Sequence, residues 1–348
     1  MINVSTEKSK HNYMQQCFPE IDVVLLSWNR IEMTVDTINN LMKKKKVNLH
    51  IWVVDQGSEA ENLNRLNSAV ADHSNVHVKA LGRNIGVPAG RNLGMKLGKA
   101  EYTVSIDNDA IFASEYALAE VAKIFGENSK IGIIGFRIMN YFTEQDDENS
   151  WSYPKSLKKL RDQRFTATAF CGCGHAIRRS AFQDAGYYDD NIFFMLEEHD
   201  LSYRVINLGY QIIYEPSVLV RHKVSPEARV QWKNRRFYYL VRNMLYINLK
   251  YTDNKIGLIM PILGYFLKGI YNKLPLQAVL GIIDSFRMYS AFLSQLPEDV
   301  RNIYRLTDEA KIYFQKNDLD YRGSLWHRVR NDVLAGLPGD SRSTKLSQ

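Results

Sequence analysis

Two carboxylates separated by one residue, Asp107 and Asp109 in the run Asp107-Asn108-Asp109, have a spacing that suits metal chemistry. Carboxylate oxygens are hard ligands of the kind that Mg²⁺ and Mn²⁺ prefer. A cation held there can neutralise negative charge as it develops on a phosphate leaving group. The same spacing recurs at Asp318 and Asp320, where no other feature supports a site. The first pair directly follows the apolar run 102–106, and this context favours it as the metal site.

A second acidic cluster contains Glu197, Glu198 and Asp200 and can supply a proton acceptor. On a helix, Glu197, Asp200 and Arg204 share one face, where Arg204 can pair with Asp200, and Glu198 points elsewhere. A carboxylate within hydrogen-bond reach of a hydroxyl can remove its proton. The alternative is a helix N-terminus enriched in acids by the helix dipole. His222 follows an apolar stretch and, taken alone, is more often a core or surface residue than a ligand.

The elements that must position these residues alternate between strand and helix. Short, β-branched apolar runs predict buried parallel strands at 21–27, 47–55, 76–80 and 102–106, with helices between them. This alternation predicts an α/β protein whose mostly parallel sheet carries helices on both faces. Such sheets bind ligands beyond the carboxyl ends of their strands. The polar residues expected at that edge are Asn29, Arg30, Asp55, Gln56, Arg83, Asn84, Asp107 and Asp109.

The remainder of the chain divides by composition. Further strands are predicted at 131–138, 166–171 and 211–214, a helix at 196–208, and an acid-rich insertion or mobile loop at 139–163. The predicted division is a polar arm at 1–18, a catalytic domain at 19–230, a helical region at 231–335 and a flexible tail at 336–348. Apolar helices at 256–270 and 276–293 are interrupted by polar residues and flanked by Lys and Arg. They fit an interfacial membrane helix or packing within the protein or a homodimer equally well.

Composition narrows the class of protein further. Apolar residues make up 45% of the 348 residues and charged residues 24%, as in an ordinary folded protein. An excess of 45 Lys and Arg over 38 Asp and Glu gives a net charge of +7, which suits a phosphate-bearing substrate, a nucleic acid or an anionic membrane surface. No nucleic-acid-reading motif supports the second of these. The three cysteines do not form a disulfide framework, and neither a secretory signal nor a spanning helix is expected. A reducing cytoplasm is the expected compartment.

Taken in order, the motifs across residues 21–243 resemble the inverting glycosyltransferases of family 2, which have the GT-A fold. The first predicted strand and its turn, the run Val53-Val54-Asp55-Gln56-Gly57-Ser58, and the run from Asn84 to Asn92 are similar to the family's nucleotide-binding elements. The fold implied is a Rossmann-like, mostly parallel sheet with helices on both faces, plus a C-terminal helical extension. The resemblance implies these nucleotide-sugar-binding residues: Ser27, Asn29, Arg30, Asp55, Gly57, Asn84, Arg91, Asp107 and Asn108.

The same resemblance assigns the reacting groups. Asp109 matches the metal-binding carboxylate, and His222 resembles a histidine that can join the metal shell. Glu198 takes the place of the catalytic base, where the family usually has Asp. The residues implied on the acceptor side are Gly172, Cys173, Gly174, Glu197 and Asp200. Arg242 and Asn243 resemble the R-N pair that follows in the family.

The function implied is inverting, metal-dependent transfer of a sugar from a nucleotide-diphosphate donor, UDP- or dTDP-linked by preference, to a hydroxyl acceptor. The acceptor expected is a bacterial polysaccharide or cell-surface glycan, lipid-linked in many such enzymes. The cofactor implied is Mn²⁺ or Mg²⁺. The protein would then work in the cytoplasm or at the inner face of the membrane. Two alternatives stay open: a nucleotidyltransferase, which would normally carry a Gly-rich loop with a lysine, and a non-catalytic nucleotide-sugar binder.

Overall fold

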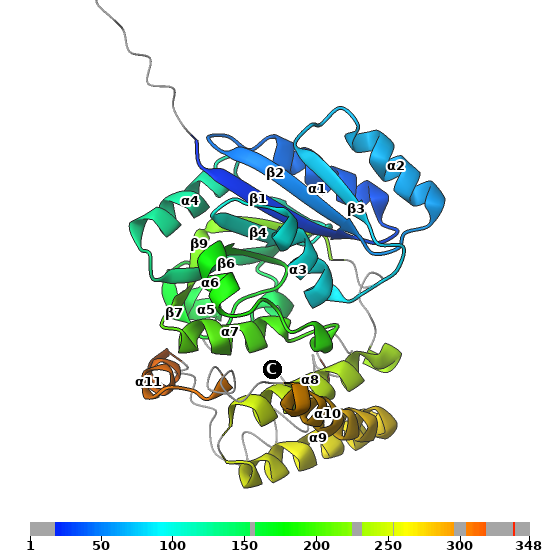
Figure 1. Ribbon diagram of the computed structural model, residues 1–348, viewed down its shortest axis with the longest axis vertical. Helices are drawn as coiled ribbons and strands as arrows, with labels where there is room; N and C mark the ends of the chain where they lie inside the picture. The colour runs from blue at the N-terminus through cyan, green and yellow to red at the C-terminus, as the bar shows by residue number, and fades with distance from the viewer. Residues whose placement is uncertain are drawn as a thin grey trace, which may run out of the picture.

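A computed structural model describes residues 18–153, 157–224, 232–252, 254–295, 304–317 and 337. Nearly all of the predicted arm at 1–18, most of the tail at 336–348, and the second acidic motif at 318–320 lie outside the described residues. Figure 1 shows two layers: a sheet with its helices, and below it a group of C-terminal helices that includes α8 (Phe237–Tyr251), α9 (Ile259–Tyr271) and α10 (Pro275–Gln295).

The first half of the sheet is parallel, as predicted. Its strands are β1 (Glu20–Ser27), β2 (Asn48–Asp55), β3 (Val76–Ala80) and β4 (Tyr102–Ile106), in the order β3-β2-β1-β4. The intervening helices are α1 (Ile31–Met42), α2 (Ala60–Val70) and α3 (Val87–Leu97). Side chains of β1 are buried on both faces, because Val23 packs into one apolar cluster and Val24 into the other. This explains why its sequence is a continuous apolar run.

The second half of the sheet is mixed. Here β8 (Gly174–Arg178) lies antiparallel between β4 and β6 (Ile131–Asn140). Next comes β9 (Gln211–His222), parallel to β6, and β9 also pairs antiparallel with β5 (Ala110–Phe112) and β7 (Phe165–Ala167). Neither β5 nor β8 was predicted, and β9 runs far beyond the predicted 211–214. The segment predicted as a loop at 139–163 contains a 3₁₀ turn (Glu148–Ser150) and the short helix α5 (Leu157–Leu160).

Helices cover both faces of the sheet. The cluster on one face contains residues of α1, α2 and α4 (Ala117–Glu127). The cluster on the other contains residues of α3, α6 (Arg179–Asp184), α7 (Glu197–Asn207) and α11 (Asp308–Asn317). The predicted helix at 196–208 is therefore confirmed as α7, whereas α11 was not predicted. The predicted helices at 256–270 and 276–293 correspond to α9 and α10.

Candidate active site

The carboxyl ends of β1, β2 and β4 place the predicted nucleotide-side residues along one edge of the sheet. Asp55, at the end of β2, is fully buried and accepts hydrogen bonds from the backbone N–H groups of Gly57 (3.1 Å) and Ser58 (2.9 Å). Gly57 has φ +86°, and a Cβ there would come within 2.7 Å of the Arg83 backbone nitrogen. This position therefore requires glycine. Asp55 shapes the loop after β2, and a contact between Asp55 and a nucleotide base stays a prediction.

Two asparagines hold the neighbouring loops of this edge. Asn29 Oδ1 accepts a hydrogen bond from the backbone N–H of Glu59 at 2.8 Å, which ties the loop after β1 to the loop after β2. Asn84 Oδ1 accepts one from the backbone N–H of Gly86 at 2.8 Å, just before α3 begins. Behind them, Ser27 and Asn108 both reach the hydroxyl of Thr34 on α1, at 3.3 and 2.9 Å. Asn29, Asn84, Ser27 and Asn108 thus make hydrogen bonds within the protein along this edge of the sheet.

Asp109 is held between two cationic side chains. Its Oδ1 lies 3.2 Å from Nε2 of His222, and its Oδ2 accepts a hydrogen bond from Arg30 at 3.0 Å. The antiparallel pairing of Ala110 with His222 brings the end of β9 to this point. Burial alone would raise the pKa of Asp109, but His222 and Arg30 hold it below its usual value. Asp109 is therefore a carboxylate at neutral pH.

The residues around Asp109 fit a divalent cation. In the described part of the chain, Asp107, Cys173 and His222 each offer a ligand atom, and these atoms lie within 4.8 Å of one another. Burial raises the pKa of the Cys173 thiol to about 11, so it is neutral near pH 7. Two carboxylates and an imidazole are a donor set suited to Mn²⁺ or Mg²⁺. The structure thus places Cys173, predicted on the acceptor side, beside Asp107 and His222.

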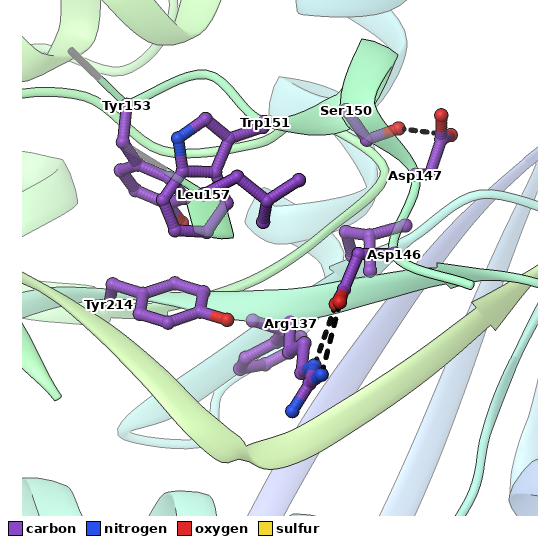
Figure 2. A pocket seen from close by; sticks show the side chains of 10 residues that line it. Arg137, Asp146, Asp147, Ser150, Trp151, Tyr153, Leu157 and Tyr214 are labelled. Atoms are coloured by element: carbon purple, nitrogen blue, oxygen red, sulfur yellow. Dashed lines mark hydrogen bonds and ion pairs between the residues drawn. The ribbon is translucent and has the colours of Figure 1, made fainter. Parts of the chain in front are cut away.

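Asp147, which the sequence did not single out, approaches His222 from the other side. Its Oδ2 lies 3.7 Å from the buried Nδ1 of His222, a nitrogen without a hydrogen bond within the described residues. Figure 2 shows Ser150 bonded to Asp147 at 2.7 Å, and Arg137 paired with the adjacent Asp146. The segment predicted as an insertion or mobile loop therefore reaches His222. No sequence pattern indicated this, since the contact depends on how 146–150 folds back along β6.

Arg91, on α3, joins the two halves of the site. It is almost fully buried, and its Nη1 lies 3.0 Å from Glu197 Oε1 and 3.2 Å from Glu198 Oε1. Its Nη2 lies 3.2 Å from Asp107 Oδ1 and donates to the carbonyl of Gly172 at 2.8 Å. The sequence predicted Arg91 as a nucleotide contact. The structure instead places its guanidinium between the metal-side carboxylate and the acidic start of α7.

Glu197 and Glu198 are neighbours in different surroundings. Glu197 is 3% exposed, and burial together with repulsion from Glu198 raises its pKa to about 8 against the opposing pull of Arg91. The Glu198 side chain retains more exposure, 13%. A Cβ at Gly172 would overlap Glu198 Oε1, so the glycine leaves the space that this carboxylate occupies. Of the two, Glu198 is the accessible proton acceptor.

Asp200 contacts groups other than those around Arg91. Its fully buried carboxylate accepts hydrogen bonds from Arg204 (2.6 Å), Lys250 (2.5 Å) and Tyr251 (3.0 Å). The predicted pairing of Asp200 with Arg204 is confirmed. Gly174 starts β8 and packs against Phe136 and Val220. For both residues an acceptor-side role stays a prediction, and the contacts observed are internal.

The loop before α7 has an unusual backbone and a dedicated support. Phe193, Met195 and Leu196 have φ values of 60°, 70° and 69°, a left-handed conformation that costs free energy in residues with side chains. Asn243 Nδ2 donates to the carbonyls of Phe194 (2.7 Å) and Met195 (2.8 Å). Asn243 therefore stabilises the loop that precedes Glu197 and Glu198. The sequence indicated the R-N pair but no role for it.

A family model, glycosyl transferase family 2, matches residues 22–186. Residues 22–186 are therefore similar to this family. The matched region includes Asp55, Arg91, Asp107 and Asp109. Glu198 and His222 lie beyond it, and the structure brings them to the same edge of the sheet. The mixed α/β architecture of the chain is the GT-A fold.

Individual proteins are similar to parts of this chain. An uncharacterized protein of Haemophilus influenzae is 27% identical over 48% of this chain and 91% of its own length. The dTDP-rhamnosyl transferase RfbF of Shigella flexneri is 24% identical over 53% of this chain and 63% of its own length. Among solved structures, a mannosyltransferase from Pyrobaculum calidifontis in complex with GDP-Man and Mn²⁺ is similar with a TM-score of 0.54 and 16% identity. That similarity covers 87% of this chain and 88% of the archaeal one.

Proposed function

We propose that this protein is an inverting, metal-dependent glycosyltransferase that moves a sugar from a nucleotide-diphosphate sugar to a hydroxyl acceptor. The observation that carries the proposal is the Arg91 bridge, which holds Asp107 and Glu198 on one guanidinium. Asp107, the proposed metal-binding carboxylate, and Glu198, the proposed proton acceptor, therefore lie on either side of one cation. Direct transfer requires these two functions together, because the leaving diphosphate and the attacking hydroxyl act on the same sugar carbon.

The proposed roles follow from the contacts. Asp107, Asp109 and His222 would hold the divalent cation. That cation would supply charge neutralisation for the leaving diphosphate. Glu198 would accept the proton of the acceptor hydroxyl as its oxygen attacks the anomeric carbon opposite the leaving group. The configuration inverts because the acceptor attacks directly, without a covalent glycosyl-enzyme step.

The surroundings of Glu197 support Glu198 as the base. Burial and repulsion from Glu198 raise the pKa of Glu197, so burial penalises its charged form. It is also bonded to Arg91 and almost entirely buried. Its place next to Glu198 instead supplies shape and a hydrogen bond that orients Arg91.

The finer substrate assignments rest on the relatives. The Shigella relative is a dTDP-rhamnosyl transferase and the archaeal structure binds GDP-Man and Mn²⁺. We therefore propose a dTDP- or UDP-linked hexose or deoxyhexose as donor, Mn²⁺ or Mg²⁺ as cofactor, and a bacterial cell-surface polysaccharide as acceptor. The reaction would take place in the cytoplasm, where nucleotide sugars are made.

A donor screen tests the proposal. Purified protein is titrated calorimetrically with UDP-, dTDP- and GDP-sugars, with Mn²⁺, with Mg²⁺ and with a chelator. We expect one nucleotide class to bind in a metal-dependent way, and slow donor hydrolysis to accompany binding. Asp109→Ala should abolish the metal dependence, whereas Glu198→Gln should keep donor binding. The anomeric configuration of the product, read by NMR, tests inversion.

The outcomes separate the alternatives. Absence of binding by every nucleotide sugar under every metal condition contradicts the proposal. Binding without hydrolysis or transfer to any glycan acceptor points to the non-catalytic binder. Release of pyrophosphate from a nucleoside triphosphate and a sugar phosphate points to the nucleotidyltransferase.

A further inference from the structure

The hairpin formed by α9 and α10 buries small residues most deeply and leaves several of its large apolar residues exposed. In α9 the residue buried among those described is Gly269, and in α10 the buried residues are Ala278, Gly281 and Ser285. These small residues face the protein: a Cβ on Gly269 would lie 2.6 Å from Ala278, and one on Gly281 would lie 2.9 Å from Val241 of α8. A helix of a water-soluble protein normally buries its large apolar residues. This hairpin buries its small ones.

The large apolar side chains of the hairpin form two exposed stripes. On α9, Met260 is 62% exposed, and Leu263 and Leu267 follow on the same side of the helix. On α10, Leu276 is 69% exposed, and Leu280 and Ile283 follow with the same spacing. Spacings of three and four residues place each set on one helix face. Figure 1 shows both helices in the layer farthest from β2 and β3. Contiguous exposed apolar surface of this kind marks an interaction site.

The charges around the stripes are predominantly positive. Within residues 254–295 the basic side chains are Lys255, Lys268, Lys273 and Arg287, and the acidic one is Asp284. Asp284 is engaged by Tyr238 at 2.8 Å and by Arg287 at 2.9 Å. The hairpin therefore combines an apolar face with a positive surround. In the described part of the chain, no helix is long and apolar enough to cross a bilayer.

We propose that the face formed by Met260, Leu263, Leu267, Leu276, Leu280 and Ile283, the hairpin face, binds an anionic lipid surface with both helices lying in the plane of the interface. Apolar side chains would enter the acyl boundary, while the lysines and Arg287 meet the headgroups. A second copy of the chain fits this face less well. A two-fold contact would set the same positive surround against itself.

The hairpin face is linked to the catalytic edge through one helix. Gly281 of α10 packs against Val241 of α8, and two residues further along α8 Asn243 braces the loop before Glu197. Binding of the hairpin face to lipid would therefore hold the proton-acceptor side of the site at a fixed height above the membrane. An acceptor with an apolar anchor would meet the enzyme in that geometry.

Flotation of the full chain with lipid vesicles tests the proposal without any donor, so its result is independent of the proposed reaction. Vesicles of phosphatidylcholine alone are compared with vesicles that also contain phosphatidylglycerol, at low and high salt. We expect the protein to float with the anionic vesicles at low salt and less at high salt. The double variant Leu263→Asp/Ile283→Asp should lower partitioning by about tenfold or more. Lys273→Gln should lower it by about fivefold.

A matched control separates the hairpin face from general surface effects. Ile312 on α11 is 61% exposed, so Ile312→Asp makes the same chemical change elsewhere and should float like the original protein. The proposal is overturned if the protein does not float with anionic vesicles at low salt, or if Ile312→Asp reduces flotation as much as the double variant does. It is also overturned if light scattering shows a dimer that the double variant dissociates while no form floats. Circular dichroism checks that each variant is folded.

Discussion

At the scale of single residues, the site depends on two adjacent carboxyl groups with different surroundings. Glu197 is buried against Arg91 with its pKa raised by burial and by Glu198, whereas Glu198 keeps contact with solvent. Their side chains differ in burial, not in type, so their roles follow from position on α7. Replacement of each by glutamine removes the charge and keeps the shape.

We expect Glu198→Gln to lower kcat by about 10²- to 10⁴-fold, the range lost when a general base is removed. Glu197→Gln should cost less than about tenfold, because glutamine mimics the protonated carboxyl group and its carbonyl can still accept from Arg91. Steady-state transfer assays of both variants at one pH make the comparison. Equal losses in the two variants would contradict the assignment of Glu198 as base.

Gly172 gives a second prediction at this scale. Gly172→Ala should displace the Glu198 carboxylate, since the new methyl group needs the space that Oε1 occupies. We expect kcat to fall by about 100-fold, with donor affinity nearly unchanged. Gly126→Ala is the control, because nothing lies within 4 Å of a Cβ there. In α4 it should add about 0.5–1 kcal/mol to the free energy of unfolding. Donor titration with single-turnover kinetics separates binding from chemistry.

At the scale of elements, the loop before α7 stores strain and Asn243 of α8 compensates for it. We expect Asn243→Ala to lower kcat by about 10- to 100-fold while the KM for donor changes little, because the loop carrying Glu198 would relax. The lost hydrogen bonds should also lower the free energy of unfolding by about 1–3 kcal/mol.

A control at the other end of α7 distinguishes positioning from stability. Asn207 lies near the other end of α7 and donates to the Arg305 carbonyl. Asn207→Ala should lower stability modestly and leave kcat unchanged. If kcat fell in both variants in proportion to the drop in their melting temperatures, Asn243 would have only a structural role.

Elements also show where the sequence could be interpreted and where it could not. Asp55 and Asp107 were predicted at one edge because parallel strands bring their carboxyl ends together. β8 escaped prediction because His175 and Arg178 interrupt its apolar pattern. In the fold both are buried with partners, His175 against Tyr188 and Arg178 against backbone carbonyls. β9 contains Pro216, and its register with β6 shifts there, so the strand continues past a residue that normally ends one.

At the scale of the whole molecule, a buried ionic cluster joins the sheet layer to the C-terminal helices. Lys250 of α8 is fully buried and donates to Asp189 at 2.9 Å and to Asp200 at 2.5 Å. Ion pairs between residues far apart in the sequence leave no pattern in it. The position of Arg91 between Asp107 and α7 is likewise not predictable from the sequence. The sequence predicted the layers and several site residues, but not the contacts that link them.

This cluster predicts a single cooperative unfolding transition for the two layers. We expect Lys250→Met to lower the free energy of unfolding by about 3–5 kcal/mol, because it leaves buried carboxylates without their cation. Lys123→Met, which breaks an exposed pair with Glu120, should change it by less than about 0.5 kcal/mol. Differential scanning calorimetry makes the measurement. Two separate transitions in the original protein would contradict the prediction.

The same cluster makes the stability of the fold depend on pH in the acidic range. Burial alone would raise the pKa of Asp189, but Lys250, Tyr246 and Asn191 lower it from 3.8 to about 2. A lowered carboxyl pKa stabilises the fold at pH values above the unfolded pKa, and this contribution is lost as the pH falls through the folded value. We therefore expect stability to decline between about pH 4 and pH 2, and to decline less in Lys250→Met, which has already lost this contribution.

The salt bridge between Arg30 and Asp109 bears on the order in which ligands arrive. A metal ion that approaches Asp109 alone must displace Arg30, a cation of the protein itself, from that carboxylate. A nucleotide diphosphate offers Arg30 a new anionic partner, so the exchange becomes favourable when ion and donor enter together. The affinity for Mn²⁺ should then rise in the presence of nucleotide, and by thermodynamic reciprocity the nucleotide should bind more tightly with the ion by the same factor. The enzyme would load its cofactor and its donor as one unit in each catalytic cycle.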